Sequence, residues 1–244
     1  MINFKEKSLI ILPHLDDEFA LTPILNIFSE NADINKIKVM YCCERRTGKN
    51  ARNSLKRRIE NLKALELFNI NKSQIIYLND FCFSDDLELR KNSEKIAKYI
   101  NKIFVNFSFS QALTLSYEGG HPDHDALALI VKRFAKDKKI NTFFFPAYNY
   151  ERNFVFPFTI LKPLKSQKNI FKYFSLSKFC WFNSLRISLI YKSEYKAFFK
   201  LIPFLIYKTL FSHGIYISKN IDVDLVDWDK SLCNKRYKKK SMKA

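Results

Sequence analysis

The chain has 244 residues, 47% of them apolar, which is enough to bury a substantial core and excludes a disordered protein. Its 42 Lys and Arg residues outnumber its 24 Asp and Glu residues, so the formal net charge is +18. Such a charge suits nucleic acid, an anionic membrane or an acidic substrate, but abundant lysine also follows from an AT-rich genome. Because the chain has no RNA-binding signature, zinc finger or heptad array, we expect no nucleic-acid partner.

Strands and helices are predicted to alternate along the first 146 residues. Short apolar runs predict buried strands, and apolar residues repeated every three to four positions predict amphipathic helices. In chain order, these patterns predict a strand at 8–12, a helix ending near 29, a strand at 36–43, a helix at 54–68, a strand at 74–78, a helix at 93–107, a strand at 111–116, a helix at 124–135 and a strand at 141–146. This alternation predicts an α/β, Rossmann-like three-layer fold with a mostly parallel sheet.

The rest of the chain is less regular and is rich in Phe, Tyr and Lys. We expect helical pieces at 178–211 and a strand at 214–218. No linker, repeat or low-complexity segment indicates a second domain. We therefore expect a single domain over 1–244, with a Rossmann-like half at 1–146, an aromatic and basic part at 147–230 that shapes the pocket, and a basic tail at 231–244.

Cysteine spacing and hydropathy indicate where in the cell the protein is located. The five cysteines have no CxxC spacing and their number is odd, so we expect no disulfide framework and a cytoplasmic location. The first residues do not resemble a signal peptide, and no uncharged apolar stretch is long enough to span a membrane. The segment FFKLIPFLIYKTLF (198–211) predicts a buried or interfacial helix. The basic tail leaves open a peripheral contact with anionic lipid at the inner face of the membrane.

Two short motifs contain most of the histidines. PHLDDE (13–18) follows the first predicted strand, and EGGHPDHD (118–125) follows the fourth. Open α/β sheets bind ligands beyond the carboxyl ends of their strands, so both motifs belong to one edge of the sheet. Three of the four histidines, His14, His121 and His124, are therefore expected at this edge. No dinucleotide fingerprint or P-loop pattern supports nucleotide binding.

The residue types of these motifs suit a catalytic zinc ion, which usually has three His, Asp or Glu ligands and an open position for water. His14 and Asp17 can converge if their loop turns into the next helix, and a histidine of the second motif would complete the site. Taken singly, each motif could instead be an acidic or proline-led helix start. A magnesium site built of carboxylates is the main inorganic alternative, but the histidines argue against it.

Together the motifs resemble those of the PIG-L/LmbE family of zinc-dependent deacetylases. RRIENLKALELFNI (57–70) is similar to a helix of that family, with Arg57 and Glu60 at matching positions, and YKSEYKAF (191–198) is similar to a late element, with Glu194 where Gln is common. The family removes acetyl groups from N-acetylglucosamine-containing molecules and related amides.

The resemblance implies roles for the matching residues. It assigns zinc, or another divalent ion such as Fe2+, to His14, Asp17 and His124. It makes Asp16 the general base that takes a proton from the zinc-bound water. It makes His121 the residue that, when protonated, stabilises the oxyanion or donates a proton to the leaving amine.

Three further residues are implied around this centre. Asp123 is expected to tune a histidine by hydrogen bonding, and Arg57 and Asp80 match positions that contact substrate hydroxyls or phosphate. The implied function is hydrolysis of the N-acetyl group of an N-acetylated sugar or sugar conjugate, in glycan, glycolipid or cell-envelope polysaccharide biosynthesis. Another metal-dependent hydrolase, such as a phosphoesterase or amidase, and a protein that binds through its charge are the alternatives.

Some features lie outside the resemblance. Asn69 stands where the family has Gly, and FALTPIL (19–25) lacks the Gly pair that commonly follows the first motif. His213 is outside both motifs, and we expect it to be an ordinary structural residue. Gly119 and Gly120 are half of the glycines in the chain, and we expect a tight backbone turn there, beside the ligand.

Overall fold

A central parallel sheet organises the fold in the computed structural model, which describes residues 2–31, 34–44, 53–82, 84–149, 151 and 159–221. The strands lie in the order β3-β2-β1-β4-β5, and every neighbouring pair is parallel. This confirms the predicted α/β fold and all five predicted strands, with slightly shorter ends. The strands are β1 (Ser8–Leu12), β2 (Ile37–Tyr41), β3 (Ile75–Tyr77), β4 (Gln111–Leu115) and β5 (Asn141–Phe145).

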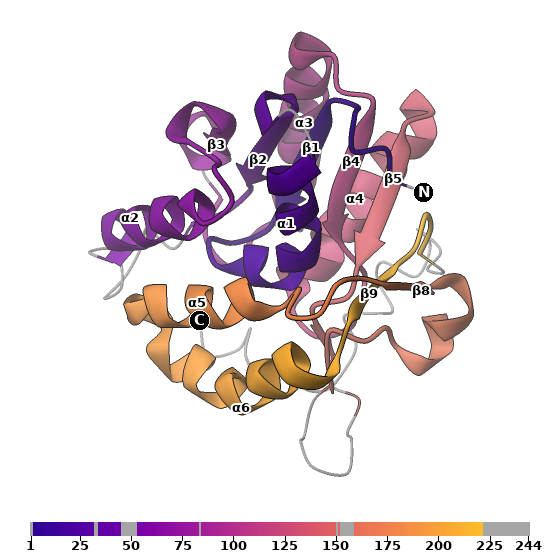
Figure 1. The fold of residues 1–244 in the computed structure, drawn as a ribbon. Helices are drawn as coiled ribbons and strands as arrows, with labels where there is room; N and C mark the ends of the chain where they lie inside the picture. Colours follow the sequence, from indigo (N-terminus) through magenta and orange to yellow (C-terminus); the bar gives the residue numbers. More distant parts are fainter. Residues whose placement is uncertain are drawn as a thin grey trace.

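Helices cover both faces of this sheet (Figure 1). Alternate side chains of β1 enter two different cores, since Ile10 and Leu12 pack on the side of α1 and α2, and Leu9 and Ile11 pack on the side of α3 and α4. The predicted three layers are therefore present. The helices of this half are α1 (Thr22–Asn31), α2 (Asn53–Glu66), α3 (Ser93–Phe107) and α4 (Pro122–Lys138), with short 3-10 turns η1 (Asp17–Leu21), η2 (Ile34–Lys36), η4 (Lys72–Gln74) and η5 (Leu78–Asp80).

The strand order creates a crevice between β1 and β4. The chain winds outward from β1 to β3, then returns through α3 and adds β4 on the other side of β1. The segments that leave β1 and β4 therefore run to opposite faces of the sheet, which opens a ligand site at their carboxyl ends. Both histidine motifs follow these two strands, as expected.

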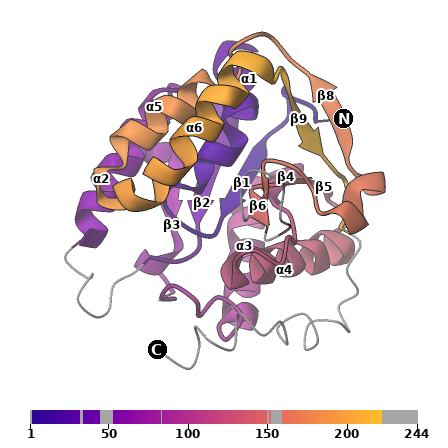
Figure 2. The ribbon, with the colours of Figure 1, turned by 90° about the horizontal axis from the view of Figure 1, so that it is seen from below.

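The C-terminal part packs beyond this edge of the sheet (Figure 2). Its two helices pack against each other, and the first of them contacts α2 and η1. The predicted strand at 214–218 is present and pairs antiparallel with a strand that the sequence did not reveal. The elements are β6 (Tyr148–Asn149), β7 (Thr159–Ile160), η6 (Lys165–Ile170), β8 (Lys172–Ser175), α5 (Phe182–Ile190), η7 (Lys192–Glu194), α6 (Tyr195–Phe211) and β9 (Gly214–Ile217).

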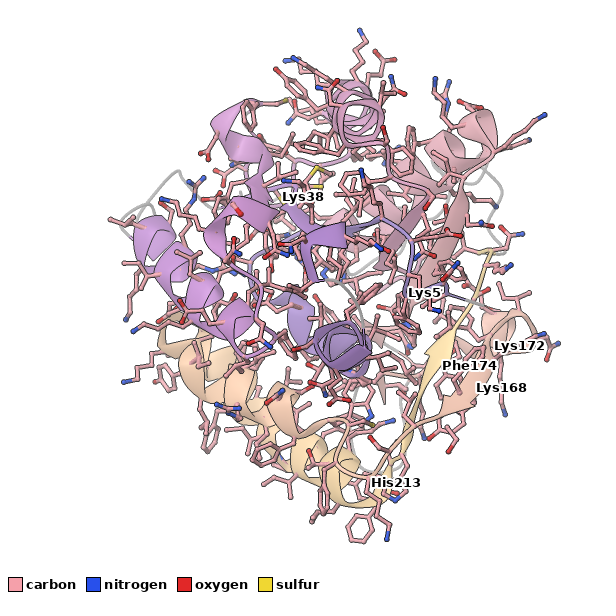
Figure 3. All side chains as sticks on the ribbon, turned by 45° about the horizontal axis from the view of Figure 1, so that its top comes forward. Lys5, Lys38, Lys168, Lys172, Phe174 and His213 are labelled. Atoms are coloured by element: carbon pink, nitrogen blue, oxygen red, sulfur yellow. The ribbon has the colours of Figure 1, made fainter. Side chains whose placement is uncertain are left out.

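Individual positions agree with their expected backbone roles. Asn69 adopts a left-handed conformation with φ 60°, which explains how it replaces the Gly of the family's helix end. His213 lies between α6 and β9 (Figure 3), and its carbonyl accepts a hydrogen bond from the Leu176 N–H. None of the helices in the described ranges combines the length and apolarity needed to cross a membrane. The predicted tail at 231–244 lies outside the described residues.

Candidate active site

A cavity of about 480 Å³ opens at the carboxyl ends of β1 and β4. Its walls come from the turn after β1, from α2, from the loop before α3, from the start of α4 and from the first two turns of α6. Residues on both sides of position 146 therefore line the cavity. The residues of the two motifs that face it are His14, Asp16, Asp17, His121 and His124.

The first motif forms a tight turn that separates its two aspartates. Asp16 has φ 107°, an unusual value for a non-glycine residue, and Asp17 starts η1 immediately after it. The Asp17 carboxylate accepts a hydrogen bond from the His14 backbone N–H at 2.9 Å, which closes the turn. The Asp16 carboxylate instead lies 3.2 Å from the guanidinium of Arg57. The two adjacent carboxylates therefore make different contacts.

The second motif is the start of α4. His121 caps the helix, since its Nδ1 accepts a hydrogen bond from the Asp123 N–H at 3.2 Å, and Pro122 takes the first helical position. Upstream, Gly119 has φ 62°, and a Cβ on Gly120 would lie 2.3 Å from the carbonyl oxygen of Tyr148. Both glycines are thus required by the turn that brings the motif beside the cavity, as expected.

Three imidazoles converge at one point, and a carboxylate lies beside two of them. One ring nitrogen from each of His14, His121 and His124 lies within 4.8 Å of the others. Asp17 connects two of them, with one oxygen 3.3 Å from His14 Nδ1 and the other 3.3 Å from His124 Nε2. Two ligand atoms, each about 2.0–2.1 Å from a tetrahedral zinc ion, are separated by about 3.4 Å. The residues therefore fit a divalent metal ion.

Asp123 fixes the orientation of His14 from behind the cluster. Its carboxylate lies 2.9 Å from His14 Nε2 and also accepts hydrogen bonds from the backbone N–H groups of Leu87 and Leu89. Burial alone would raise the pKa of Asp123, but the hydrogen bond and charge of His14 lower it. Asp123 thus contacts Nε2 of His14, and Nδ1 of the same ring faces Asp17.

His121 has a different electrostatic environment from the other two histidines. Burial, followed by the neighbouring charges of His14 and His124, lowers the pKa of His121 to about 3. Because its Nδ1 accepts the backbone hydrogen bond of the helix cap, the neutral ring carries its proton on Nε2. A neutral His121 would therefore present an N–H donor to the cavity.

Asp16 lies beside a cation at the rim of the cluster. Burial raises its pKa well above the usual range, the Arg57 charge opposes this rise, and the Asp17 charge adds to it. The other side of the Arg57 guanidinium lies 3.4 Å from Glu194, and both residues line the cavity. Asp80 is not among the described residues that line the cavity. It pairs instead with Arg58 at 2.7 Å, so its predicted contact with substrate stays a prediction.

Two segments that resembled the family separately meet in the structure. The Ser193 backbone N–H donates to the Glu60 carboxylate at 3.1 Å, next to the pair of Arg57 and Glu194. The Tyr191 hydroxyl donates to Glu18 at 2.6 Å. The late element thus connects the α2 helix and the first motif to the start of α6, and it positions the wall of the cavity.

Several residues of the site were not identified from the sequence. Asp86 lies 3.1 Å from His14 Nε2, and Tyr148 and Phe198 line the cavity. Asp85 and Asp86 follow the carboxyl end of β3, so the rule that located the two motifs would have found them. Phe198 had no such signal, because its position depends on how α6 packs.

Comparisons with known proteins identify the family and similar folds. The family described as PIG-L, GlcNAc-PI de-N-acetylase, matches residues 9–135, and no curated protein sequence matches the chain significantly. A deacetylase of the A40926 pseudoaglycone has a similar structure, with 15% identity, a TM-score of 0.61 and coverage of 88% of this chain and 95% of that one. The zinc inhibited form of teicoplanin deacetylase is similar at 13% identity, with a TM-score of 0.55 and coverage of 88% and 99%.

A third similar structure is the N,N'-diacetylchitobiose deacetylase from Pyrococcus horikoshii, at 17% identity, with a TM-score of 0.51 and coverage of 88% and 84%. Identities this low show a shared fold. The family match is more specific, because it spans more than half of the chain and includes both histidine motifs. On this evidence, the chain belongs to the PIG-L family, described as GlcNAc-PI de-N-acetylase.

Proposed function

We propose that this protein is a metal-dependent deacetylase that hydrolyses the N-acetyl group of an N-acetylated sugar or sugar conjugate. The observation that carries the proposal is the cluster of His14, His121 and His124, in which the Asp17 carboxylate contacts His14 and His124. A second carboxylate, Asp16, is held apart from them in the same cavity. The similar structures support this choice, since their names describe an A40926 pseudoaglycone deacetylase, a teicoplanin deacetylase and a diacetylchitobiose deacetylase.

His14, Asp17 and His124 would hold the ion, which we propose is Zn2+, with Fe2+ as the alternative in the cell. His14 would offer Nδ1, because its Nε2 faces Asp123, and His124 would offer Nε2. When bound there, a divalent ion supplies Lewis acidity that lowers the pKa of water and polarises the acetyl carbonyl. The name of one similar structure refers to zinc, which supports a site that accepts this ion.

Asp16 would serve as the general base. Its carboxylate faces the cavity but contacts neither histidine ligand in the described structure, so it keeps the lone pairs that accept a proton from the attacking water. Burial raises its pKa, which makes it a stronger base than a solvated aspartate. Arg57 restrains the same carboxylate and keeps it from turning into the metal cluster.

His121 would stabilise the carbonyl oxygen as negative charge develops on it. A neutral imidazole with its proton on Nε2 can donate a hydrogen bond without first being protonated. As the amine leaves, the proton that Asp16 took from the attacking water would pass to its nitrogen. Acetate and the free amine are then the products.

The sugar would lie over Tyr148 and Phe198, which give the cavity its apolar walls. Arg57 would contact a substrate hydroxyl or phosphate, and Asp80 remains a proposed contact from outside the described wall. We propose a place in glycan, glycolipid or cell-envelope polysaccharide biosynthesis and a cytoplasmic location, with no nucleic-acid partner. A phosphoesterase or amidase using the same ligands is the alternative function.

An acetate-release assay on a panel of N-acetyl sugars and their nucleotide and lipid conjugates tests this proposal. We expect acetate from at least one substrate, loss of activity with a chelator, and recovery after Zn2+ or Fe2+ is added back. Phosphate release from a matching panel of phosphate esters is measured for comparison with acetate release. Release of phosphate, with no acetate from any amide, would replace the deacetylase by the phosphoesterase alternative.

A further inference from the structure

The outer surface of α5 and α6 exposes a concentration of large apolar side chains. Of the sixteen exposed large apolar residues in the described ranges, nine lie between residues 179 and 211. Buried residues of α6, such as Phe198 and Leu205, occupy the opposite side of the helix, so the exposed ones form one continuous arc. We call this surface the α5–α6 face, defined by Phe179, Phe182, Phe199, Ile206, Tyr207, Leu210 and Phe211.

Contacts show that the face is continuous across both helices. Phe182 of α5 and Ile206 and Leu210 of α6 line one open hollow of about 590 Å³. The rings of Tyr207 and Phe211 are 5.3 Å apart. Phe199 is 70% exposed, and contiguous exposed apolar patches, unlike single exposed residues, mark interaction sites. The surface is therefore a patch with a purpose beyond packing.

Cations predominate around this patch. Exposed cations interleave with the aromatic residues at Lys178, Arg186, Lys192, Lys196 and Lys200. The only acidic residue between 178 and 211 is Glu194, which is half-buried and paired with Arg57. Glu30 of α1, at the edge of the hollow, is the one carboxylate that borders it.

An apolar arc with interleaved cations fits an anionic lipid bilayer better than a protein partner. Aromatic and aliphatic side chains enter the boundary between headgroups and acyl chains, while Lys and Arg contact anionic headgroups. Protein interfaces, by contrast, are depleted of lysine. A second copy of the chain would also present the same cations, which would repel each other.

We propose that the α5–α6 face docks the protein on anionic lipid bilayers. The proposal does not depend on the deacetylase function. It places α6 between the bilayer and the active site, because the same helix lines the cavity with Phe198 and Leu201.

Vesicle flotation with the full chain tests the docking. The probes are vesicles of phosphatidylcholine alone and of phosphatidylcholine mixed with phosphatidylglycerol. We expect binding only to the mixed vesicles, weakened as salt concentration rises. The variant Phe199→Ser, Tyr207→Ser, Phe211→Ser should reduce binding about tenfold or more, because it removes the apolar anchors.

A matched control changes equally exposed apolar residues elsewhere. Phe81 and Val105 are 64% and 61% exposed and lie outside the face, so Phe81→Ser, Val105→Ser should bind vesicles as the wild type does. Thermal melting and acetate release should be unchanged in both variants, which shows that folding and activity are intact. A third variant, Lys238→Gln, Lys239→Gln, Lys240→Gln, tests the basic tail.

Three results would overturn the proposal. The first is wild-type chain that does not float with anionic vesicles. The second is unchanged binding by the triple aromatic variant, with the loss found in the tail variant instead. The third is self-association in analytical ultracentrifugation that the triple aromatic variant abolishes, because the face would then join two copies of the chain.

Discussion

The crevice between β1 and β4 and the outer surface of α5 and α6 use their side chains in opposite ways. At the crevice, His14, Asp17 and Asp123 are buried and each contacts a partner of opposite or complementary charge. On the α5–α6 face, aromatic side chains such as Phe199 and Phe211 are more than half exposed. Charged side chains are thus buried at the crevice, and apolar side chains are exposed to water on the α5–α6 face.

This difference predicts how much a substitution in each region changes the free energy of unfolding. A buried charge needs its partners, so removing one group at the crevice leaves another unsatisfied and has a large effect. Truncation of an exposed aromatic residue changes the free energy of unfolding of the protein little. We therefore expect substitutions at the crevice to change activity or stability strongly. Substitutions on the α5–α6 face should change only the binding of a partner.

The largest expected effect separates the two histidines of the second motif. We expect His124→Ala to lose both bound metal and activity, because it removes a proposed ligand. His121→Ala should keep the metal but lower kcat by about 10²–10³-fold, the usual consequence of losing an oxyanion donor. Metal analysis beside acetate release measures both. If His121→Ala empties the site and His124→Ala does not, the roles are reversed.

The next effect concerns the base. Asp16→Asn should lower kcat/KM by about 10²–10⁴-fold at unchanged metal content, since the amide cannot accept the proton of water. A pH profile of the wild type provides a second measurement. Because burial raises the pKa of Asp16, activity should fall with decreasing pH at higher values than for a solvated carboxylate. Wild-type turnover by Asp16→Asn would exclude it as the base.

A buried cation beneath the α5–α6 face gives an effect on stability. Lys208 is 3% exposed and forms no ion pair with the described residues, and burial, with the charge of Lys162, lowers its pKa from 10.5 to about 8. This difference corresponds to a cost of about 3 kcal/mol. The cost is complete below about pH 8, where the folded state must protonate the amine, and it disappears as pH rises toward 10.5.

Lys208→Met should therefore stabilise the protein by up to about 3 kcal/mol at pH 7, and by less at pH 9.5. Urea unfolding at the two pH values measures the difference. Lys196→Met, at an exposed position of the same helix, is the control and should change the free energy of unfolding little. An equal gain at both pH values would mean that packing, and not the charge, is responsible.

The smallest expected effect tests the connection between the two regions. Tyr191→Phe removes the hydroxyl that bonds Glu18 and Asn61, so it should destabilise the fold by about 2 kcal/mol. Tyr195→Phe, whose ring is 60% exposed, should have almost no effect. Chemical unfolding of both variants provides the comparison. Equal stability would show that the late element is held by other contacts.

Residues of the site could be predicted from the sequence only where histidines or carboxylates directly follow a predicted strand. His14, Asp17, His121 and His124 were found because each follows a buried strand, and parallel strands end at one edge. The lowered pKa of His121 could not be predicted, because it depends on burial and on the charges of His14 and His124. The pairing of Asp80 with Arg58 likewise depends on neighbours that local pattern does not show.

By itself, the sequence determined the parallel sheet, its helices and the position of both motifs, because apolar periodicity and turn residues act over a few neighbouring positions. Only the tertiary structure decided which groups share a cavity. The pairs of Glu18 with Tyr191 and of Arg57 with Glu194 join residues more than 130 positions apart. Such contacts form because buried polar groups must find partners, and the packing of α5 and α6 determines which partners are within reach.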